Sequence, residues 1–186
     1  MTPGARILGV AALLLCLLPQ ACRRGHDAAH LAQVDSLLRT TDSLIALMNA
    51  QDTTDLAAWT NAYRQHREQV VARLNDTLDK STALTLGNYH RLMGKTLARA
   101  RNEHPSVLIG LNTARRQLAD LRNDVEKGLL EPAAEATYIQ QERLALEAVA
   151  HNAGVVVNSY ANARNSLREL APTVDSLLRD TMQRTP

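Results

Sequence analysis

Apolar residues recur every three or four positions along most of this chain, the spacing that places them on one face of an α-helix. The longest series keeps one heptad register without a slip, through Ile139, Glu142, Leu146, Val149, Ala153, Val156, Tyr160, Ala163, Leu167, Leu170, Val174 and Leu177. It predicts a final helix from Pro132 to about Asp180, roughly 70 Å long at about 1.5 Å per residue. Gly154 and Pro172 are the weak points of this helix, and we expect Pro172 to kink or break it.

Two earlier series predict the helices that precede it. The first predicts a helix from Asp27 to Ala50. The second predicts a helix from Thr54 to Lys80, through Leu56, Trp59, Tyr63, Val70, Leu74 and Leu78. Ser81 and Thr82 can cap a new helix there. The apolar series nevertheless continues with no proline before Pro105, so we favour one helix from Thr54 to Arg101 over two.

The segment Asn102–Pro105 predicts a stop and a restart, because proline suits the first turn of a helix. The next helix should run from Pro105 to Lys127, with Gly128 just beyond its end. The hexapeptide at 34–39, VDSLLR, recurs unchanged at 174–179. The flanking residues show little similarity, so we interpret the repeat as convergence on amphipathic helices.

Composition agrees with a helical fold, since the chain has no Phe and one Trp, while the strong helix formers Ala, Leu and Arg abound. Short connections favour neighbouring antiparallel helices. We therefore predict an all-α fold, an antiparallel bundle of four to five helices with long, coiled-coil-like helices. The bundle domain should span 31–182, followed by a frayed tail over 183–186.

The amino-terminal residues have a different pattern. Arg6 lies in a short positive region, and 7–18 form an apolar run too short to cross a bilayer as a helix. Ala21 then precedes Cys22. This order resembles the signal of bacterial lipoproteins, in which the cysteine is lipidated and becomes the first residue of the mature chain.

The resemblance implies an export signal over 1–21, lipidation of Cys22 and a lipidated tether over 22–30. It also implies a place in the bacterial cell envelope, anchored by the lipid, at the outer membrane facing the periplasm. A cleaved soluble protein and an uncleaved amino-terminal anchor are the alternatives.

Cysteine content and charge exclude several classes of site. No cysteine follows Cys22, so the mature chain has neither a disulfide framework nor a thiol site. The net charge is +2, which provides no field to attract nucleic acid, and stacking aromatic residues are scarce. We expect no nucleic-acid partner.

Two pairs of side chains have the spacing of metal ligands. His26 and His30 lie four residues apart, as do Glu147 and His151. A metal site needs a third or fourth ligand, and the first pair falls in the predicted tether. We therefore expect solvated side chains, with no metal and no cofactor.

One carboxylate, Glu142, occupies a core position of the long heptad series. Because an unpaired buried carboxylate is costly, it should find a partner. His66 lies at a similar position in its own helix, which makes it a candidate for a buried polar contact with Glu142. Exposure of Glu142 beyond the end of the bundle is the alternative.

Three basic residues, Arg91, Lys95 and Arg99, line one helical face. Such a stripe can bind phosphate, peptidoglycan carboxylates or lipid headgroups. The more ordinary interpretation is a solvated face paired with acids such as Asp120, Asp124 or Glu126.

Neither a glycine-rich phosphate loop nor a nucleophile elbow occurs in the sequence. The predicted function is therefore that of a non-catalytic interaction or structural protein, held at the membrane by the lipid on Cys22. Its partner would be an envelope protein or a second copy of itself. A periplasmic metal- or ligand-binding sensor, or a coiled-coil protein with an uncleaved amino-terminal anchor, are the alternatives.

Overall fold

The computed structural model describes residues 27–73 and 78–184 of the chain, with side chains over 27–72 and 78–180. The predicted export signal, Cys22, His26 and Leu74 lie outside the described residues. Four helices account for almost all of the described part, which contains no strand: α1 (Ala28–Asn49), α2 (Thr53–Arg73), α3 (Lys80–Glu126) and α4 (Pro132–Arg184). The predicted all-α class is confirmed.

Three of the helices begin at an aspartate cap. The carboxylates of Asp27, Asp52 and Asp79 accept hydrogen bonds from backbone N–H groups two and three residues further on, at 2.7–3.4 Å. Each carboxylate satisfies N–H groups that the first helical turn leaves without an intrahelical partner. The backbone hydrogen bonds lower the pKa of Asp27 and Asp52. The pKa of Asp79 is lowered first by the hydrogen bond from the Thr82 hydroxyl and then by the backbone bonds.

The predicted positions of the helix breaks are corrected by the structure. The single helix from Thr54 to Arg101 is wrong, because α2 ends at Arg73 and α3 begins at Lys80, behind its cap Asp79. The alternative break near Ser81 is close to the observed one. The break at Pro105 is also wrong, since α3 passes through it.

Packing explains why α3 continues past Pro105. A proline inside a helix costs about 3 kcal/mol, because it lacks an N–H and crowds the preceding turn. Ala100, His104, Val107 and Leu111, on both sides of it, are all buried. Two helices broken at this point would lose that continuous buried face. Pro172 likewise lies inside α4 without ending it.

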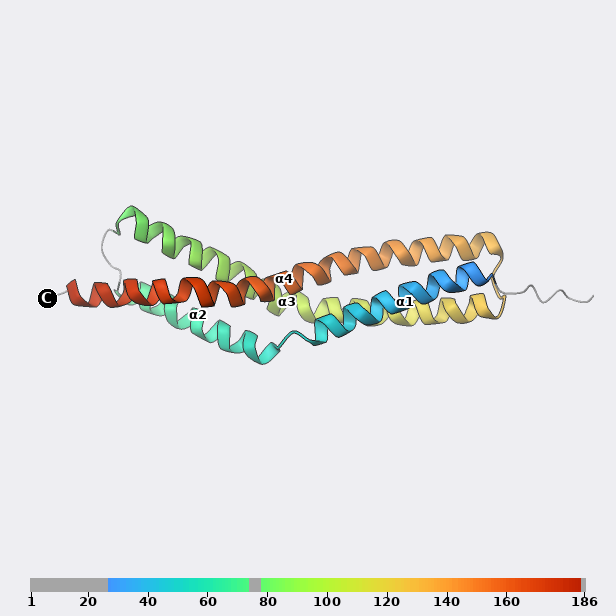
Figure 1. Cartoon of the computed structure of the whole chain (residues 1–186), viewed down its shortest axis with the longest axis horizontal. Coiled ribbons are helices and arrows are strands. Elements are labelled where there is room, and N and C mark those ends of the chain that lie inside the picture. The colour runs from blue at the N-terminus through green and yellow to red at the C-terminus, as the bar shows by residue number, and fades with distance from the viewer. Residues whose placement is uncertain (1–26, 74–77, 185–186) are drawn as a thin grey trace, which may run out of the picture.

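The four helices form an elongated rod in which α3 and α4 pack together along their lengths (Figure 1). Both α1 and α2 pack against this pair but not against each other. They lie one after the other along it, with the joint at 50–52 near its midpoint (Figure 1). A cross-section of the rod therefore contains α3, α4 and either α1 or α2.

Apolar side chains from the helices supply the core. Val156 and Val174, from the predicted heptad series, are fully buried, as are Val34, Met48 and Leu118. Their burial along the whole rod stabilises it by roughly 25 cal/mol for each Å² of apolar surface removed from water. No helix in the described part is both long and apolar enough to cross a membrane.

Candidate functional site

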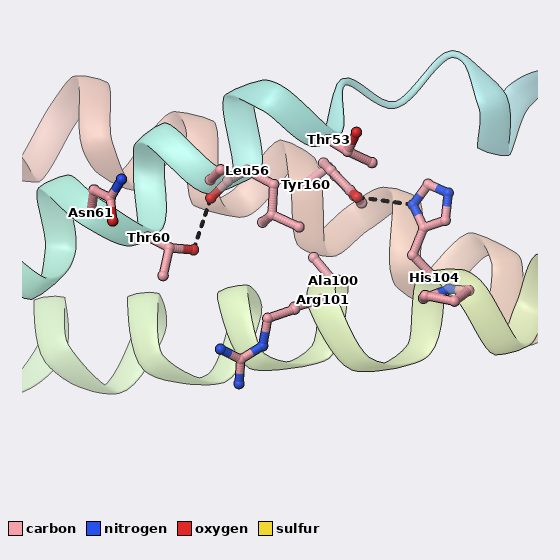
Figure 2. A pocket seen from close by; sticks show the side chains of 10 residues that line it. Thr53, Leu56, Thr60, Asn61, Ala100, Arg101, His104 and Tyr160 are labelled. Atoms are coloured by element: carbon pink, nitrogen blue, oxygen red, sulfur yellow. Dashed lines mark hydrogen bonds between the residues drawn. The ribbon is translucent and has the colours of Figure 1, made fainter.

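A hollow in the described surface lies at the midpoint of the rod, beside the joint between α1 and α2 (Figure 1). We call it the midpoint groove, and its volume is about 420 Å³. Its lining comprises Thr53, Leu56, Ala57, Thr60, Asn61, Ala100, Arg101, His104, Pro105 and Tyr160. Figure 2 shows α2 and α3 as its two walls, with α4 behind them. The exposed lining is mostly apolar, so the groove suits a hydrocarbon or an aliphatic side chain.

A buried hydrogen bond forms the back of this groove. His104 Nδ1 and the Tyr160 hydroxyl lie 2.9 Å apart, and both side chains are buried (Figure 2). Burial lowers the pKa of His104 below its ordinary value of 6.5 and raises that of Tyr160, to which the charge of Asp52 also contributes. Both side chains are therefore neutral at pH 7, and the pair satisfies its polar atoms rather than offering charge to a ligand.

A second hollow continues the groove along α2 and α3. Its volume is also about 420 Å³, and it is lined by Thr60, Tyr63, Arg64, Arg67, Glu68, Gly94, Leu97, Ala98 and Arg101. Thr60 and Arg101 line both hollows, so the two adjoin. We call the combined feature the α2–α3 groove.

Three arginines, Arg64, Arg67 and Arg101, outnumber the one carboxylate, Glu68, and give one end of the α2–α3 groove a net positive charge. Arg64 donates to the side chain of Asn61, and Arg101 donates to that of Asn102. Neither of them, nor Arg67, makes an ion pair with a carboxylate among the described residues. Their guanidinium groups can therefore bind a carboxylate or a phosphate, which an arginine holds with two parallel hydrogen bonds.

A second buried polar network lies behind this charged end. The Nδ1 atom of His66 is 2.6 Å from the Tyr89 hydroxyl, and its Nε2 atom is 3.1 Å from an Asp175 carboxylate oxygen. Tyr89 is fully buried, and burial, followed by the charge of Asp175, raises its pKa far above the ordinary value. A tyrosine that stays protonated and has no access to solvent is no nucleophile. The network of His66, Tyr89 and Asp175 therefore links three helices and does not serve a reaction.

His90 lies next to this network without joining it. Both of its ring nitrogens are buried and lack a hydrogen-bond partner among the described residues. The ring packs against Tyr63 and Tyr89, each with its centroid 5.6 Å away. Burial, and then the nearby charges of Arg67 and His66, lower the pKa of His90.

The predicted metal ligands are not brought together. His30 does not lie in a solvated tether as expected, because its side chain is mostly covered and Nδ1 is 2.8 Å from a carboxylate oxygen of Glu135. Glu147 and His151 are exposed on α4. Over 27–73 and 78–184, no group of three or more His, Cys, Asp or Glu side chains is arranged to hold a metal ion.

The predicted contact between Glu142 and His66 is wrong. His66 bonds Tyr89 and Asp175, whereas Glu142 is half-buried without a hydrogen bond or ion pair to another described residue. Burial alone raises the pKa of Glu142. The paired buried carboxylate is Glu135, which the sequence analysis missed. It lies seven residues before Glu142, so the heptad series extended by one step would have found it.

The predicted basic stripe pairs locally. Arg99 is 3.3 Å from Glu103 on the same helix, and Arg91 donates to Asn88. The acids expected to pair with it are not its partners: Glu126 instead pairs with Arg122, at 2.9 Å. Lys95 has no ion-pair partner in the part that the structure describes. The stripe is mostly solvated surface.

Charge is distributed unevenly between the two halves of the rod. We define the α1 half as α1 and its cap Asp27, with 104–126, 132–157 and the loop between them. We define the α2 half as α2 with 78–103 and 158–180. Acids outnumber bases in the α1 half. Its acids are Asp27, Asp35, Asp42, Asp120, Asp124, Glu126, Glu131, Glu135, Glu142 and Glu147, and its bases are Arg39, Arg115, Arg116, Arg122, Lys127 and Arg143. Bases outnumber acids among the described side chains of the α2 half. The bases are Arg64, Arg67, Lys80, Arg91, Lys95, Arg99, Arg101, Arg164, Arg168 and Arg179, and the acids are Asp55, Glu68, Asp79, Glu103, Glu169, Asp175 and Asp180.

No protein-family model, curated protein or solved structure matches this chain. What the groove can bind is therefore argued from its own geometry and charge.

Proposed function

We propose that this protein is a lipid-anchored, exported helical bundle that acts as a non-catalytic interaction protein of the bacterial envelope, and that the α2–α3 groove is its binding site. The observation that carries the proposal is an apolar hollow, open to solvent, that adjoins three arginines without carboxylate partners. This combination suits a partner with an apolar surface and nearby carboxylates.

The groove favours binding over catalysis. Its hydroxyl group on Thr60 donates to the carbonyl of Leu56, and its histidine, His104, bonds Tyr160. A nucleophile would need a base within hydrogen-bond reach. Apart from Thr53, Asn61 and Glu68, the lining side chains left facing solvent are apolar or cationic, and these supply affinity and orientation.

The proposed architecture is an antiparallel, coiled-coil-like bundle. Asp35 pairs with Arg122 and Asp42 pairs with Arg115. Residue numbers therefore increase along α1 in the direction in which they decrease along α3, so the two helices are antiparallel. Between α3 and α4 the contacts also run in opposite orders, since His104 bonds Tyr160 whereas Gly110 lies against Val149. Such a bundle exposes a long, narrow surface, which suits an interaction protein.

The anchor on Cys22 is tested by the intact mass of the mature amino terminus, purified from the membrane fraction of the native host. A mass that matches acylated Cys22 supports export and anchoring. A mass that begins at Met1 contradicts cleavage and favours the uncleaved amino-terminal anchor. An unmodified fragment in the soluble fraction contradicts the anchor altogether.

Binding in the groove is tested by a photoreactive benzoylphenylalanine in place of Ala57, an exposed lining residue. Ala32, an exposed alanine on the far half of the rod, is the matched control position. After irradiation of cells that make native amounts of the protein, we expect a defined adduct from position 57 and none from position 32. Monomer alone from both positions would contradict the proposed function.

A further inference from the structure

We infer that the partner in the α2–α3 groove is a second copy of this chain, which inserts the outer face of its own α4. The inference rests on the proposed function, because it names the occupant of the same groove. The outer face comprises Tyr138, Gln141, Leu144, Ala145 and Ala148.

The outer face has an unusual apolar exposure. Tyr138 is 46% exposed and Leu144 is 54% exposed, although both lie on a helix whose opposite side is fully packed. The positions 141, 144, 145 and 148 are three, four and seven residues apart, so they form one stripe along α4. Ala145 and Ala148 add little bulk, which lets the backbone of this helix approach another helix closely.

The groove offers the matching shape. Two helices form its walls, and Ala57, Ala98 and Ala100 keep it open between them. Its lining extends from Thr53 to Glu68 along α2, about 22 Å at ~1.5 Å per residue. The outer face of α4 is shorter than this, so it fits within the groove.

Charge complementarity selects the second copy. The groove lies in the half of the rod where bases predominate, and the outer face lies in the half where acids predominate. Glu147, exposed beside the outer face, lies about 20 Å along α4 from Tyr160 at the midpoint. Arg64 lies about 17 Å along α2 from Thr53, on the other side of the midpoint. Two rods side by side in opposite directions therefore bring Glu147 of one copy level with Arg64 of the other.

The contact is heterologous, since it joins two different surfaces. The groove opens between α2 and α3 with α4 behind it (Figure 2), whereas the outer face lies on the side of α4 away from its packed residues. Each copy therefore offers its groove to one neighbour and its outer face to another.

The test uses the lack of cysteine after Cys22 in the full chain. Asn61→Cys in the groove is combined with Ala148→Cys on the outer face, and membranes from the native host are mildly oxidised. We expect a disulfide-linked dimer of this chain from the double variant. Its yield should exceed that of either single variant at least tenfold. Ala58→Cys, exposed on α2 but outside the groove lining, is the matched control for Asn61→Cys.

A charge swap tests the pairing. Arg64→Glu should lower the disulfide yield about tenfold, because it places two carboxylates opposite each other. Adding Glu147→Arg to that variant should restore the yield. Failure of this rescue would overturn the proposed register.

The two proposals fail in different ways. If photocrosslinking at position 57 yields an adduct with a different envelope protein, and no disulfide dimer forms, the inference of a second copy is overturned while the proposed function stands. If neither a second copy nor another protein is captured at position 57, both are overturned.

Discussion

At the scale of single residues, histidines form several of the covered polar contacts between the helices of the rod. His30 with Glu135, His66 with Tyr89 and Asp175, and His104 with Tyr160 each join two or more helices. A buried polar group without a partner costs about 1–3 kcal/mol. These contacts therefore fix which helices meet at which level, a specificity that uniform leucine packing would not provide.

Acidification should destabilise the protein through His104 and His90. Burial lowers the pKa of both in the folded state, so the unfolded chain takes up protons first as the pH falls below about 6.5. The stability that the neutral side chains contribute is present above that pH and is lost as the pH falls through their folded pKa values. We expect a lower free energy of unfolding at pH 5.5 than at pH 7.5, measured by urea denaturation.

His104→Gln is the matched variant for that measurement, because the amide can still bond Tyr160 but does not titrate. It should show a smaller difference between the two pH values than the wild-type protein. An equal difference would mean that His104 does not contribute to the pH dependence.

Removing the charge of Glu142 should stabilise the protein. Burial raises its pKa, because the charged carboxylate is costly to bury without a partner. The charged form therefore lowers the free energy of unfolding, and protonation restores it as the pH falls through that pKa. Glu142→Gln should raise the free energy of unfolding at pH 7 by less than about 1 kcal/mol. Glu147→Gln, at an exposed site, should change it by no more than about 0.5 kcal/mol. A loss of stability in Glu142→Gln alone would reveal a favourable contact of the carboxylate.

At the scale of elements, the hydrophobic pattern predicts the faces of the helices but not all of their ends. The heptad series that contains Val156, Tyr160 and Val174 is the buried face of α4. The predicted ends are wrong where local sequence signals compete with packing. Pro105 resembles a helix start, yet burial on both sides of it keeps α3 continuous, and the break occurs instead before Asp79, where a cap is available.

The repeated hexapeptide VDSLLR has the same environment in both places. Val34 and Val174 are fully buried, and the adjacent Asp35 and Asp175 each pair with a basic side chain on another helix. The sequence predicts an amphipathic helix at both sites. The partners, Arg122 and His66, could not be predicted, because they depend on how the helices are placed.

Pro105→Ala distinguishes the two interpretations of this region. In the continuous α3, the alanine supplies an N–H for the carbonyl of Arg101 and should stabilise the protein by up to ~3 kcal/mol. At the first turn of a separate helix, the same substitution would be neutral or destabilising, because proline is preorganised there. The change in melting temperature gives the answer. A decrease would contradict the observed continuity.

At the scale of the whole molecule, the structure is set by the two long helices. The pair α3 and α4 extends along the rod. One part of this pair packs against α1 and the other part packs against α2. The sequence predicts two long and two short helices, but it assigns one of the long ones to 54–101. The sequence also predicts the break between Ala50 and Thr54, in agreement with the joint at 50–52. What it could not provide is that two short helices succeed one another there on the same pair and leave the midpoint groove beside them.

The continuity of α4 can be measured as a distance between spin labels. In a variant with Gln140→Cys and Arg179→Cys, the labels should lie about 60 Å apart, at ~1.5 Å per residue of uninterrupted helix. If the chain reversed at Pro172, the distance would be about 40 Å. A chain with only Gln140→Cys controls for labelling of the native cysteines.

The single tryptophan of the chain lies beside this midpoint. Trp59 meets the ring of Tyr160 edge to face, with centroids 6.4 Å apart, and the guanidinium of Arg164 lies 5.6 Å from its centre. Because Tyr160 also lines the groove, an occupant that shifts this ring changes the surroundings of the indole. When the excitation wavelength is one that only the indole absorbs, the emission of the unlabelled protein therefore comes from one known place. Its wavelength and intensity provide an intrinsic optical signal of whether that place is filled.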